Sequence, residues 1–531
     1  MTTQYQQTKT LARSAGIVGT AVMASRILGL VREQVFAGLF GAGPAYDAFV
    51  VAYRIPNLLR DLFAEGALSA AFVTVFTDFK ARLGREITWR LARNVITTLI
   101  LIVGIICLAG MFLSRDIVML MTADRFIQIP GQLDLTTLMT MIMIPYLLLV
   151  ALSAVSMGML NTMGKFFIPS MASCFFNLGS IIAGVALTLA APHFGYTPIV
   201  GMAWGVVVGG ILQVLIQVPS LRRQGFHYRP LLDFSDPGLR RILLLMLPAV
   251  IGFAAPQFNN FINTWFASSC ETGSLSWLQY AYRVLWFPIG LVGSSLAIAA
   301  MPVMSRHAST GNTAALRQAY TSTTVMSFIL SIPAMCGLIF LAQPIIRILF
   351  ERGQFSALAT EKTAIALSIY ALGLFAFSAL KITIPIFYAL NKTKYPVIGA
   401  FLTVALNLVI IFATIEQLKY CAIALSFALF TTFNFLFLAV ILYRLLQGFP
   451  IRYLLGCIIK IVPISIATGA LSWWLNSRLL VLLADMPLAG VWALLTAILC
   501  GVIFYAVCIS ITGIREVNDI KHSIIIRIKG L

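Results

Sequence analysis

The feature that most constrains the fold of this chain is its series of long apolar segments, each about as long as the 20 residues with which an α-helix crosses a bilayer. Charged residues make up only 10% of the sequence, compared with about 25% in soluble proteins. No long polar stretch is left for a large soluble domain. The apolar runs are continuous rather than alternating, which excludes a transmembrane β-barrel. The sequence therefore predicts an all-α polytopic membrane protein with about 14 transmembrane helices. The predicted spans cover approximately residues 13–40, 46–79, 94–114, 136–161, 168–190, 198–220, 242–269, 276–304, 319–342, 363–390, 396–415, 420–443, 454–475 and 487–511.

Positive charge is distributed unevenly along the chain, which has a net charge of +19. If the N-terminus is cytoplasmic, 23 of the 37 Lys and Arg residues fall in segments on the cytoplasmic side and seven fall in segments on the outer side. This asymmetry follows the positive-inside rule of membrane proteins. It predicts that both termini are cytoplasmic, and it accounts for the net charge without a nucleic-acid partner.

Short motifs recur at a nearly constant offset and indicate an internal repeat. Ala52-Tyr53-Arg54 recurs as Ala281-Tyr282-Arg283, which is 229 residues further along the chain. Leu160-Asn161 recurs as Leu390-Asn391, and Asn177-Leu178 as Asn407-Leu408, each at an offset of 230. The offset contains six predicted spans, an even number, so the two copies point the same way. Such parallel repeats are related by an axis along the membrane normal.

The repeat predicts three parts of the chain. Two parallel six-helix lobes leave a central cavity, and substrate sites in such folds lie at the repeat interface. The predicted parts are an N-terminal six-helix lobe over residues 1–225, a C-terminal six-helix lobe over 226–447, and two additional transmembrane helices with a cytoplasmic tail over 448–531.

The apolar stretch from residue 25 to residue 73 carries charged side chains that a membrane helix tolerates poorly. One Arg at the centre of a spanning helix costs about 2.5–3.5 kcal/mol, so four without compensation would cost roughly 10–14 kcal/mol. These side chains must therefore face a polar cavity, a charged ligand or one another. The arginines are Arg26, Arg32, Arg54 and Arg60, and the acids are Glu33, Asp47, Asp61 and Glu65.

Two interpretations of these charges remain open. Arg26 and Glu33 are seven residues apart, as are Arg54 and Asp61, so each pair returns to nearly the same helix face and can form an internal ion pair. Alternatively, the arginines bind an anion. Arg283, at the matching repeat position, favours this second interpretation because its apolar segment contains no acid. Since a guanidinium group donates parallel hydrogen bonds to phosphate, several arginines suit a pyrophosphate or another anion.

No sequence motif indicates catalysis or a bound cofactor. The chain has no phosphate-binding GxxxxGK[ST] loop, because Gly164-Lys165 is followed by Phe166. It also has no HExxH, no GxSxG and no His/Cys cluster at metal-ligand spacing. We therefore expect no ATP, no metal ion and no enzymatic activity.

Longer stretches of the sequence resemble the MurJ/MviN family of lipid II flippases, which belongs to the multidrug/oligosaccharidyl-lipid/polysaccharide exporter superfamily. The resemblance rests on SRILGLVREQVFAGLFGAG and DAFVVAYRIPNLLRDLFAEGALSAAFV, followed in the family's order by WLQYAYRVLWFPIGLVGSSLAIAAMPVMSR, ILFERGQFS and FYALNKTKYPV. It extends over essentially the whole chain. It implies a fourteen-helix fold with two six-helix lobes, a central cationic cavity, and a hydrophobic groove at the last two helices that holds a lipid tail.

The function that the resemblance implies is lipid II translocation. Lipid II, an undecaprenyl-pyrophosphate-linked disaccharide-pentapeptide, would move from the inner to the outer leaflet of a bacterial cytoplasmic membrane by alternating access. The implied partners are lipid II and membrane lipids, and the expected protein is a monomer. Arg26, Arg32 and Arg283 match the family's cavity arginines, and Arg60 matches another of its basic positions. In full, the implied substrate-binding residues are Arg26, Arg32, Arg54, Arg60 and Arg283, and the implied gating residues are Asp47 and Glu65.

The chain departs from the family in two respects. Members often carry an acid immediately before the position of Arg283 and another three residues after it, where this chain has Tyr282 and Trp286. A gating ion pair built on those acids is therefore not expected. Some members bind sodium through carboxylates in the seventh and twelfth spans, and neither predicted span has an Asp or Glu here. The coupling ion stays open, with membrane potential as an alternative, because one charge crossing 100 mV is worth about 2.3 kcal/mol.

Three other functions are compatible with parts of the sequence. A cation-coupled drug or polysaccharide exporter of the same superfamily is the nearest alternative, although a site for organic cations would need acids rather than Arg283. A membrane-embedded lipid-linked glycosyl or phosphoryl transferase would need a metal or base constellation, for which Asp61 and Glu65 are the candidates. A scaffold for cell-wall enzymes, without transport, is the third.

Overall fold

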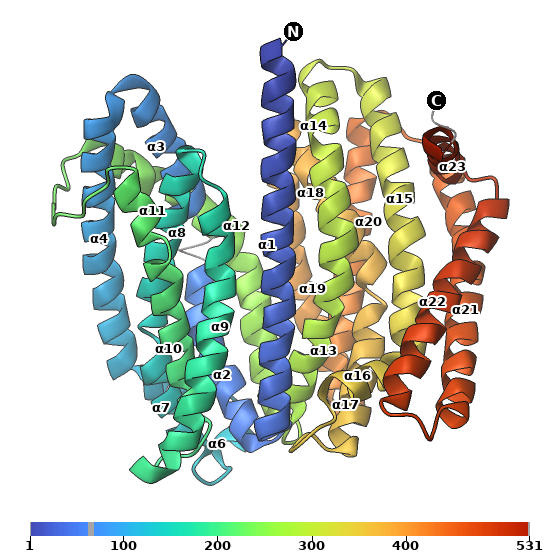
Figure 1. Cartoon of the computed structure of the whole chain (residues 1–531), viewed down its shortest axis with the longest axis horizontal. Coiled ribbons are helices and arrows are strands. Elements are labelled where there is room, and N and C mark those ends of the chain that lie inside the picture. Colours follow the sequence, from blue (N-terminus) through green and yellow to red (C-terminus); the bar gives the residue numbers. More distant parts are fainter. Residues whose placement is uncertain (1, 62–67, 529–531) are drawn as a thin grey trace. The chain divides into compact units, whose positions relative to one another are not determined.

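The computed structural model describes residues 2–61 and 68–528, and nearly all of them are helical (Figure 1). This part of the chain contains no β-strand. By its internal contacts the chain divides into two compact units, residues 1–276 (unit 1) and residues 277–531 (unit 2). Because each unit is built from long apolar helices, the predicted all-α membrane fold is confirmed.

The helices of unit 1 differ widely in length. The longest of them are α1 (Thr2–Phe40), α4 (Gly84–Phe112), α9 (Phe167–Ala190) and α12 (Pro237–Ser269). The shorter ones are α2 (Pro44–Leu59), α3 (Ser69–Arg82), α5 (Ser114–Met121), α6 (Asp124–Ile127), α7 (Gln132–Met143), α8 (Tyr146–Thr162), the 3-10 turn η2 (Ala191–Phe194), α10 (Val200–Leu215) and α11 (Val218–Arg223).

Helix α13 (Ser274–Pro288) begins in unit 1 and continues into unit 2. The π-helical segment Ile289–Ser294 joins it to α14 (Ser295–Ser309). The remaining helices of unit 2 are α15 (Thr313–Phe340), α16 (Ala342–Phe350), α17 (Ala357–Ala371), α18 (Leu374–Ala389), α19 (Lys394–Leu418), α20 (Cys421–Leu445), α21 (Ile451–Leu482), α22 (Ala489–Ile511) and α23 (Arg515–Ile528).

Fewer apolar spans are found in the structure than in the sequence count. Ten helical segments in the described ranges are long and apolar enough to cross a membrane, and the pair α17–α18, bent by 44°, would be an eleventh. The other three predicted segments correspond to α1, to α2 with α3, and to α12, which carry arginines, prolines or amides among their apolar residues. The count of fourteen transmembrane helices stays a prediction.

Two spans that contain Gly or Pro differ in their helical geometry. The eighth predicted span is interrupted by the π-helical segment Ile289–Ser294. The seventh corresponds to one continuous helix, α12, although it contains Pro248 and Pro256. Proline is tolerated in membrane helices where neighbouring groups satisfy the freed carbonyl. Pro145 and Gly373 mark two further breaks, before α8 and before α18.

Helices recur in the same order in two halves of the chain. Helix α2 begins directly after Gly43, and α13 directly after Gly273. The hairpin α9–α10 is matched by α19–α20, and the broken pair α7–α8 by α17–α18. Unit 1 nevertheless includes α12, which packs against α3, α4 and α6, although the repeat assigns α12 to the second lobe. The lobe boundaries at residues 225 and 447 stay a prediction.

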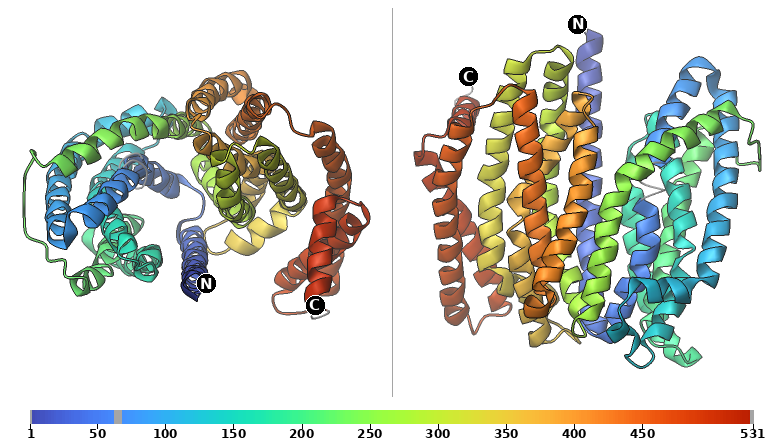
Figure 2. Two further views of the ribbon diagram at one scale, coloured as in Figure 1. Left: turned by 90° about the horizontal axis from the view of Figure 1, so that it is seen from above. Right: turned by 180° about the vertical axis from the view of Figure 1, so that it is seen from behind.

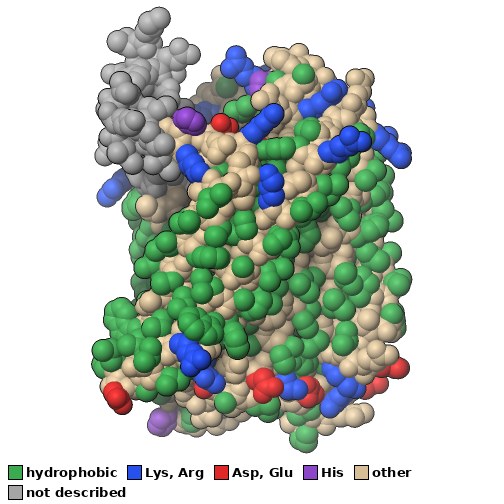
Figure 3. Space-filling view, turned by 90° about the vertical axis from the view of Figure 1, so that its right-hand side faces the viewer, with side chains coloured by type: hydrophobic (Ala, Val, Ile, Leu, Met, Phe, Trp, Pro, Cys, Tyr) green, Lys and Arg blue, Asp and Glu red, His purple; other side chains and the backbone are tan. Residues whose placement is uncertain are grey.

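The last two long helices form a pair within unit 2. Helix α21 packs along α15, and α22 packs along α21 (Figures 1 and 2). The face seen in Figure 3 carries a broad band of hydrophobic side chains between two charged edges, with Lys and Arg at both edges and Asp and Glu mostly at one. This pattern is typical of a protein surface that lies in lipid.

Candidate functional site

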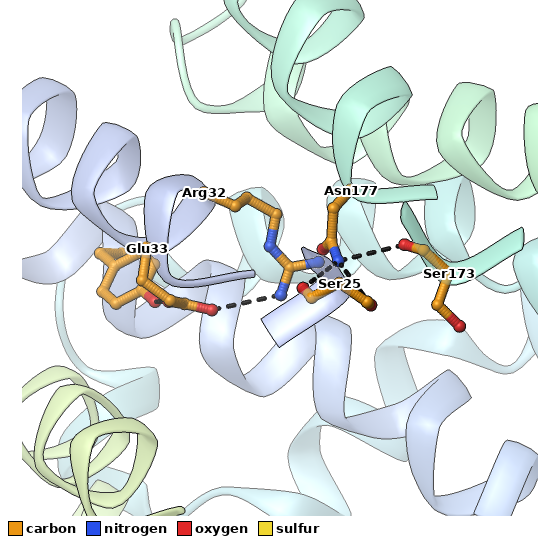
Figure 4. A network of polar contacts seen from close by, with 6 residues as sticks. Ser25, Arg32, Glu33, Ser173 and Asn177 are labelled. Atoms are coloured by element: carbon orange, nitrogen blue, oxygen red, sulfur yellow. Dashed lines mark hydrogen bonds and ion pairs between the residues drawn. The ribbon is translucent and has the colours of Figure 1, made fainter. Parts of the chain in front are cut away.

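A buried ion pair lies within the charged stretch of unit 1 (Figure 4). Arg32 and Glu33 are neighbours on α1 and are only 5% and 2% exposed. Atom Nη2 of Arg32 lies 3.2 Å from Oε1 of Glu33. The hydroxyl group of Tyr46, from the first turn of α2, donates a hydrogen bond of 2.8 Å to Oε2 of Glu33. Each carboxylate oxygen of Glu33 therefore has a partner, and one of them orients Arg32.

Two aromatic rings contact the guanidinium group of Arg32. Its Cζ atom lies 5.7 Å from the ring centroid of Tyr53 on α2 and 5.6 Å from that of Phe176 on α9. The ring quadrupole attracts a cation, and the attraction grows when water is excluded. Among the described residues, Nε of Arg32 has no hydrogen-bond partner. A buried guanidinium with an unused donor is suited to bind an anion, because an unsatisfied N–H group is costly.

The turn between α1 and α2 places these groups together. Gly41 has a φ of 63°, a left-handed conformation that favours glycine, and it reverses the chain between the two helices. Phe36 of α1 then packs against Tyr46 and Phe49 of α2, with ring centroids 5.3 and 4.5 Å apart. This aromatic hairpin holds Tyr46 beside Glu33.

A second polar contact joins α1 to α9 (Figure 4). Asn177 on α9 donates from Nδ2 to the backbone carbonyl of Ser25, at 3.1 Å, and to that of Ser173, also at 3.1 Å. Gly29 faces this amide, since a Cβ atom there would lie 3.8 Å from Nδ2. Asn177 thereby holds α1 against the helix that supplies Phe176.

Two other arginines of the stretch contact different groups. Atom Nη1 of Arg54, on α2, donates a hydrogen bond of 2.7 Å to the hydroxyl of Thr264 on α12. Arg60 donates from Nε and Nη2 to one oxygen of Asp61, at 3.0 and 2.8 Å. Arg54 therefore connects two helices, whereas Arg60 is held by its neighbour in the chain.

Internal ion pairs do form in this stretch, but between neighbours in the sequence and not between residues seven apart. Glu33 pairs with Arg32 instead of Arg26, and Asp61 pairs with Arg60 instead of Arg54. Seven residues separate two groups by about 10.5 Å along a helix axis. An arginine side chain reaches its immediate neighbour more easily, so adjacency decides the partner.

The remaining predicted site residues lie in separate places. Arg26 is partly buried on α1 and makes no ion pair within the described ranges. Arg283 is partly buried on α13, in unit 2. Glu65 lies outside the described residues, so its gating role stays a prediction. The structure thus brings Arg32 together with an acid and two aromatic rings. The other predicted arginines lie among other groups.

Asp47 is buried in the first turn of α2 and caps a different helix. Its carboxylate accepts hydrogen bonds from the backbone N–H groups of Gly273, at 2.6 Å, and Ser276, at 2.9 Å, and from the Ser276 hydroxyl, at 2.5 Å. These groups lie at the start of α13, where backbone N–H groups lack helical partners and the helix dipole is positive. Asp47 therefore stabilises the start of α13 and ties it to α2.

Four residues of the site were not predicted from the sequence. They are Tyr46, Tyr53, Phe176 and Asn177, which reach Arg32 or its helix only because α2 and α9 pack against α1. The available signals are the recurrence of Ala52-Tyr53-Arg54 as Ala281-Tyr282-Arg283 and of Asn177-Leu178 as Asn407-Leu408. No three His, Cys, Asp or Glu side chains in the described part of the chain gather as ligands for a metal ion.

Sequence comparisons identify relatives along most of the chain. The family model described as "Lipid II flippase MurJ" matches residues 36–489. The "Probable lipid II flippase MurJ" of Vibrio cholerae is 35% identical over 482 residues, covering 88% of this chain and 90% of that protein. The "Lipid II flippase MurJ" of Burkholderia cenocepacia is 34% identical over 392 residues, covering 73% of this chain and 75% of that protein.

The fold is similar to that of a solved structure. A structure described as "Lipid II flippase MurJ, inward closed conformation" is similar with a TM-score of 0.75 and 26% sequence identity, covering 93% of this chain and 98% of that one. Sequence and structure therefore agree with the resemblance found in the sequence motifs. The chain belongs to the lipid II flippase MurJ family.

Proposed function

We propose that this chain is a lipid II flippase of a bacterial cytoplasmic membrane. It moves lipid II, an undecaprenyl-pyrophosphate-linked disaccharide-pentapeptide, from the inner to the outer leaflet by alternating access, without catalysing a covalent step. Family membership supports the substrate class. The structural observation that carries the proposal is the buried guanidinium of Arg32, with an unused Nε donor beside two aromatic rings.

The diphosphate is the part of lipid II that most opposes transfer through the membrane, because a charged group that leaves water loses its hydration. Arg32 replaces that hydration, since a guanidinium group donates parallel hydrogen bonds to phosphate oxygens. Glu33 offsets the buried charge while no substrate is bound. The anion then meets the donors of Arg32 that Glu33 leaves available.

The other predicted site residues have proposed roles. Arg26, Arg54 and Arg60 are further contacts for anionic groups on unit 1, and Arg283, at the repeat position of Arg54, is a substrate-binding residue on unit 2. Asp47 is a gating residue, because movement at the start of α13 has to break its three hydrogen bonds. Glu65 is a second gating residue on the ground of the family resemblance.

Binding alone cannot drive net transport, so its direction must come from a gradient or from consumption of lipid II at the outer surface. We propose the membrane potential as one source, because an anion moving outward leaves the negative side. One charge crossing 100 mV is worth about 2.3 kcal/mol. The proposed partners are lipid II and bilayer lipids, and the proposed transport unit is a monomer.

The test is the sidedness of lipid II in cells whose only flippase is this chain. An externally added enzyme that cleaves only outward-facing lipid II reports how much has crossed. Arg32→Ala is expected to reduce cleavage to the level of depleted cells. The matched control is Arg115→Ala, which removes an exposed arginine that pairs with Asp134 at 2.9 Å, and it should leave cleavage unchanged.

Two results would contradict the proposal at different points. If depletion of the wild-type protein leaves outward lipid II unchanged, the chain does not flip this lipid. If depletion abolishes cleavage but Arg32→Ala inserts and restores it fully, the flippase function stands and the assignment of Arg32 is wrong.

A further inference from the structure

The loop between α11 and α12, residues 224–236, is fastened along α4 of unit 1. Arg93 of α4 donates from Nε to the carbonyl oxygen of His227, at 3.0 Å. Asn94 bonds both backbone groups of Asp233, because its Nδ2 donates to the carbonyl oxygen at 2.7 Å and its Oδ1 accepts from the N–H group at 2.9 Å. Figure 1 and the left view of Figure 2 show the loop beyond α4, so it lies at the edge of unit 1.

The tip of this α11–α12 loop lies level with the beginning of a membrane span. The N–H group of Leu231 donates to the hydroxyl of Thr97 at 3.1 Å, and the hydroxyl oxygens of Tyr228 and Thr97 are 3.2 Å apart. Thr97 lies about 20 Å along the axis of α4 from the start of the helix at Gly84. Helix α4 is long and apolar enough to cross a membrane, and its predicted span begins at residue 94. The tip therefore reaches the level where lipid headgroups meet the hydrocarbon.

An irregular backbone at this level needs hydrogen-bond partners from the protein, because lipid tails offer none. The three polar side chains of α4 described above supply them. Both ends of the loop are also fixed. Phe226 is buried against Trp89 of α4, with ring centroids 5.2 Å apart, and the carboxylate of Asp236 accepts a hydrogen bond of 2.7 Å from the N–H group of Gly238 at the start of α12. The loop is thus held in one shape before any ligand binds.

The exposed side of the loop combines apolar, aromatic and positive groups. Tyr228, Leu232 and Phe234 are 44%, 48% and 52% exposed. Arg229 is exposed between them, and within the described ranges it has no acidic partner. Tyrosine and arginine side chains are typical of the interface between lipid and water, where an apolar body meets hydrocarbon and a polar end meets headgroups.

The acids of the loop do not neutralise this surface, because both have other partners. Asp233 lies 3.7 Å from the guanidinium group of Arg90, and Asp236 caps α12. Arg222 and Arg223, at the end of α11, are exposed as well. Positive charge therefore predominates on the loop and beside it, and this favours an anionic ligand.

We propose that the α11–α12 loop binds the headgroup of an anionic phospholipid, with Arg229 as the main contact of its phosphate. A guanidinium group donates parallel hydrogen bonds to phosphate oxygens. A bilayer lipid fits this position because the loop lies at the edge of unit 1 and at headgroup level. The predicted orientation of the chain assigns the lipid to the inner leaflet. The proposal is independent of the proposed function, since it concerns a lipid that is bound and not transported.

The test is phospholipid binding to the purified full-length protein in detergent, measured by native mass spectrometry. The probes are phosphatidylglycerol, which is anionic, and phosphatidylcholine with the same acyl chains, which has no net charge. Wild type should bind phosphatidylglycerol at the lower concentration. Arg229→Gln should raise the phosphatidylglycerol concentration for half occupancy about fivefold, the effect of one basic residue near anionic headgroups, and leave phosphatidylcholine unchanged. Arg229→Lys keeps the charge and should stay within about twofold of wild type.

The matched control is Arg306→Gln. Arg306 is exposed in the last turn of α14 of unit 2, in another predicted cytoplasmic segment, so this variant removes the same charge elsewhere. It should bind both probes like wild type. The unfolding temperature of each lipid-free variant is measured alongside, and it should not change in Arg229→Gln because the side chain is exposed.

The result that supports the proposal is a loss of phosphatidylglycerol binding in Arg229→Gln alone, with phosphatidylcholine binding and the unfolding temperature unchanged. Unchanged phosphatidylglycerol binding in Arg229→Gln overturns it. An equal loss in Arg306→Gln also overturns it, because net charge alone would then attract the lipid. Equal binding of both probes by wild type, or an equal loss of both in Arg229→Gln, excludes recognition of the anionic headgroup. None of these results bears on lipid II transport, because lipid II is not a probe.

Discussion

At the scale of single residues, the Arg32 site shows how an apolar helix can carry a buried guanidinium group. Glu33 supplies the opposite charge, and Tyr53 and Phe176 cover the cation with ring faces. Removing one partner of such a pair leaves an uncompensated buried charge, which typically costs about 3–5 kcal/mol. The residues that keep Glu33 in place should therefore matter although they do not touch a ligand.

Tyr46→Phe tests this role at the residue scale. The variant removes the hydroxyl group that donates to Oε2 of Glu33 while keeping the ring. Losing a buried hydrogen bond to a charged group should cost about 1.5–3 kcal/mol, so we expect a lower unfolding temperature and partly reduced transport. The measurement is thermal unfolding of the purified protein together with lipid II sidedness in cells.

The matched control is Tyr53→Phe. This change keeps the ring whose centroid lies 5.7 Å from Cζ of Arg32, so the cation–π contact is retained. We expect a smaller fall in unfolding temperature than in Tyr46→Phe. Equal behaviour of the two variants would show that the Tyr46 hydroxyl does not position Glu33.

At the scale of helices, the contact between Asp47 and Ser276 reflects the internal repeat. Asp47 is related to Ser276 by the same offset of 229 residues that relates Arg54 to Arg283. Each residue lies in the first turn of its helix, α2 or α13. An acid in one copy thus binds the hydroxyl and the backbone of the equivalent position in the other, which joins the starts of two related helices.

Asp47→Asn should destabilise the start of α13. The amide keeps one acceptor oxygen but loses the negative charge and the second acceptor, while Gly273 and Ser276 keep their donors. Loss of a cap typically costs about 0.5–2 kcal/mol, so the unfolding temperature should fall. The control is Asp134→Asn, which removes an exposed ion pair worth at most about 1 kcal/mol. A larger effect of the control would contradict the capping role.

The hairpin of α9 and α10 gives a second prediction at this scale. A Cβ atom on Gly205 would lie 2.6 Å from Cα of Gly184 and 2.7 Å from the carbonyl oxygen of Ser180, both backbone atoms. Gly205→Ala should therefore push the two helices apart and cost about 1–3 kcal/mol, the usual range for overpacking. Thermal unfolding and the yield of folded protein measure the effect.

Gly104→Ala is the matched control for that prediction. Gly104 lies in α4, and a Cβ atom there meets nothing within 4 Å. Alanine has a higher helix propensity than glycine, by up to about 1 kcal/mol, so this variant should be neutral or more stable. If both alanine variants unfold at the same temperature, close packing of α9 on α10 does not contribute to stability.

These elements show how far the fold and the site could be predicted from the sequence. Hydropathy averages over a window of residues, so it locates α9 or α22 well but does not reveal the breaks at Pro145 and Gly373. The cost of a charge in lipid predicts that Arg32 faces polar or charged groups, in a cavity, on a ligand or on a neighbouring side chain. It does not identify them, because Phe176 reaches Arg32 only through the packing of α9 on α1.

At the scale of the whole molecule, the distribution of charge predicts that both termini are cytoplasmic. The basis is that 23 basic residues fall in the predicted cytoplasmic segments and only seven in the predicted outer segments. A fluorescent protein that matures only in the cytoplasm should be bright when fused after Leu531. Alkaline phosphatase, which is active only outside the cytoplasm, should be active when fused after Asp485, between the end of α21 at Leu482 and the start of α22 at Ala489. The two fusions lie on opposite sides of one predicted span. An inverted chain would therefore lose both the fluorescence and the phosphatase activity, whereas failure of one fusion would remove only one signal. Loss of both would show that the charge asymmetry does not set the orientation of this chain.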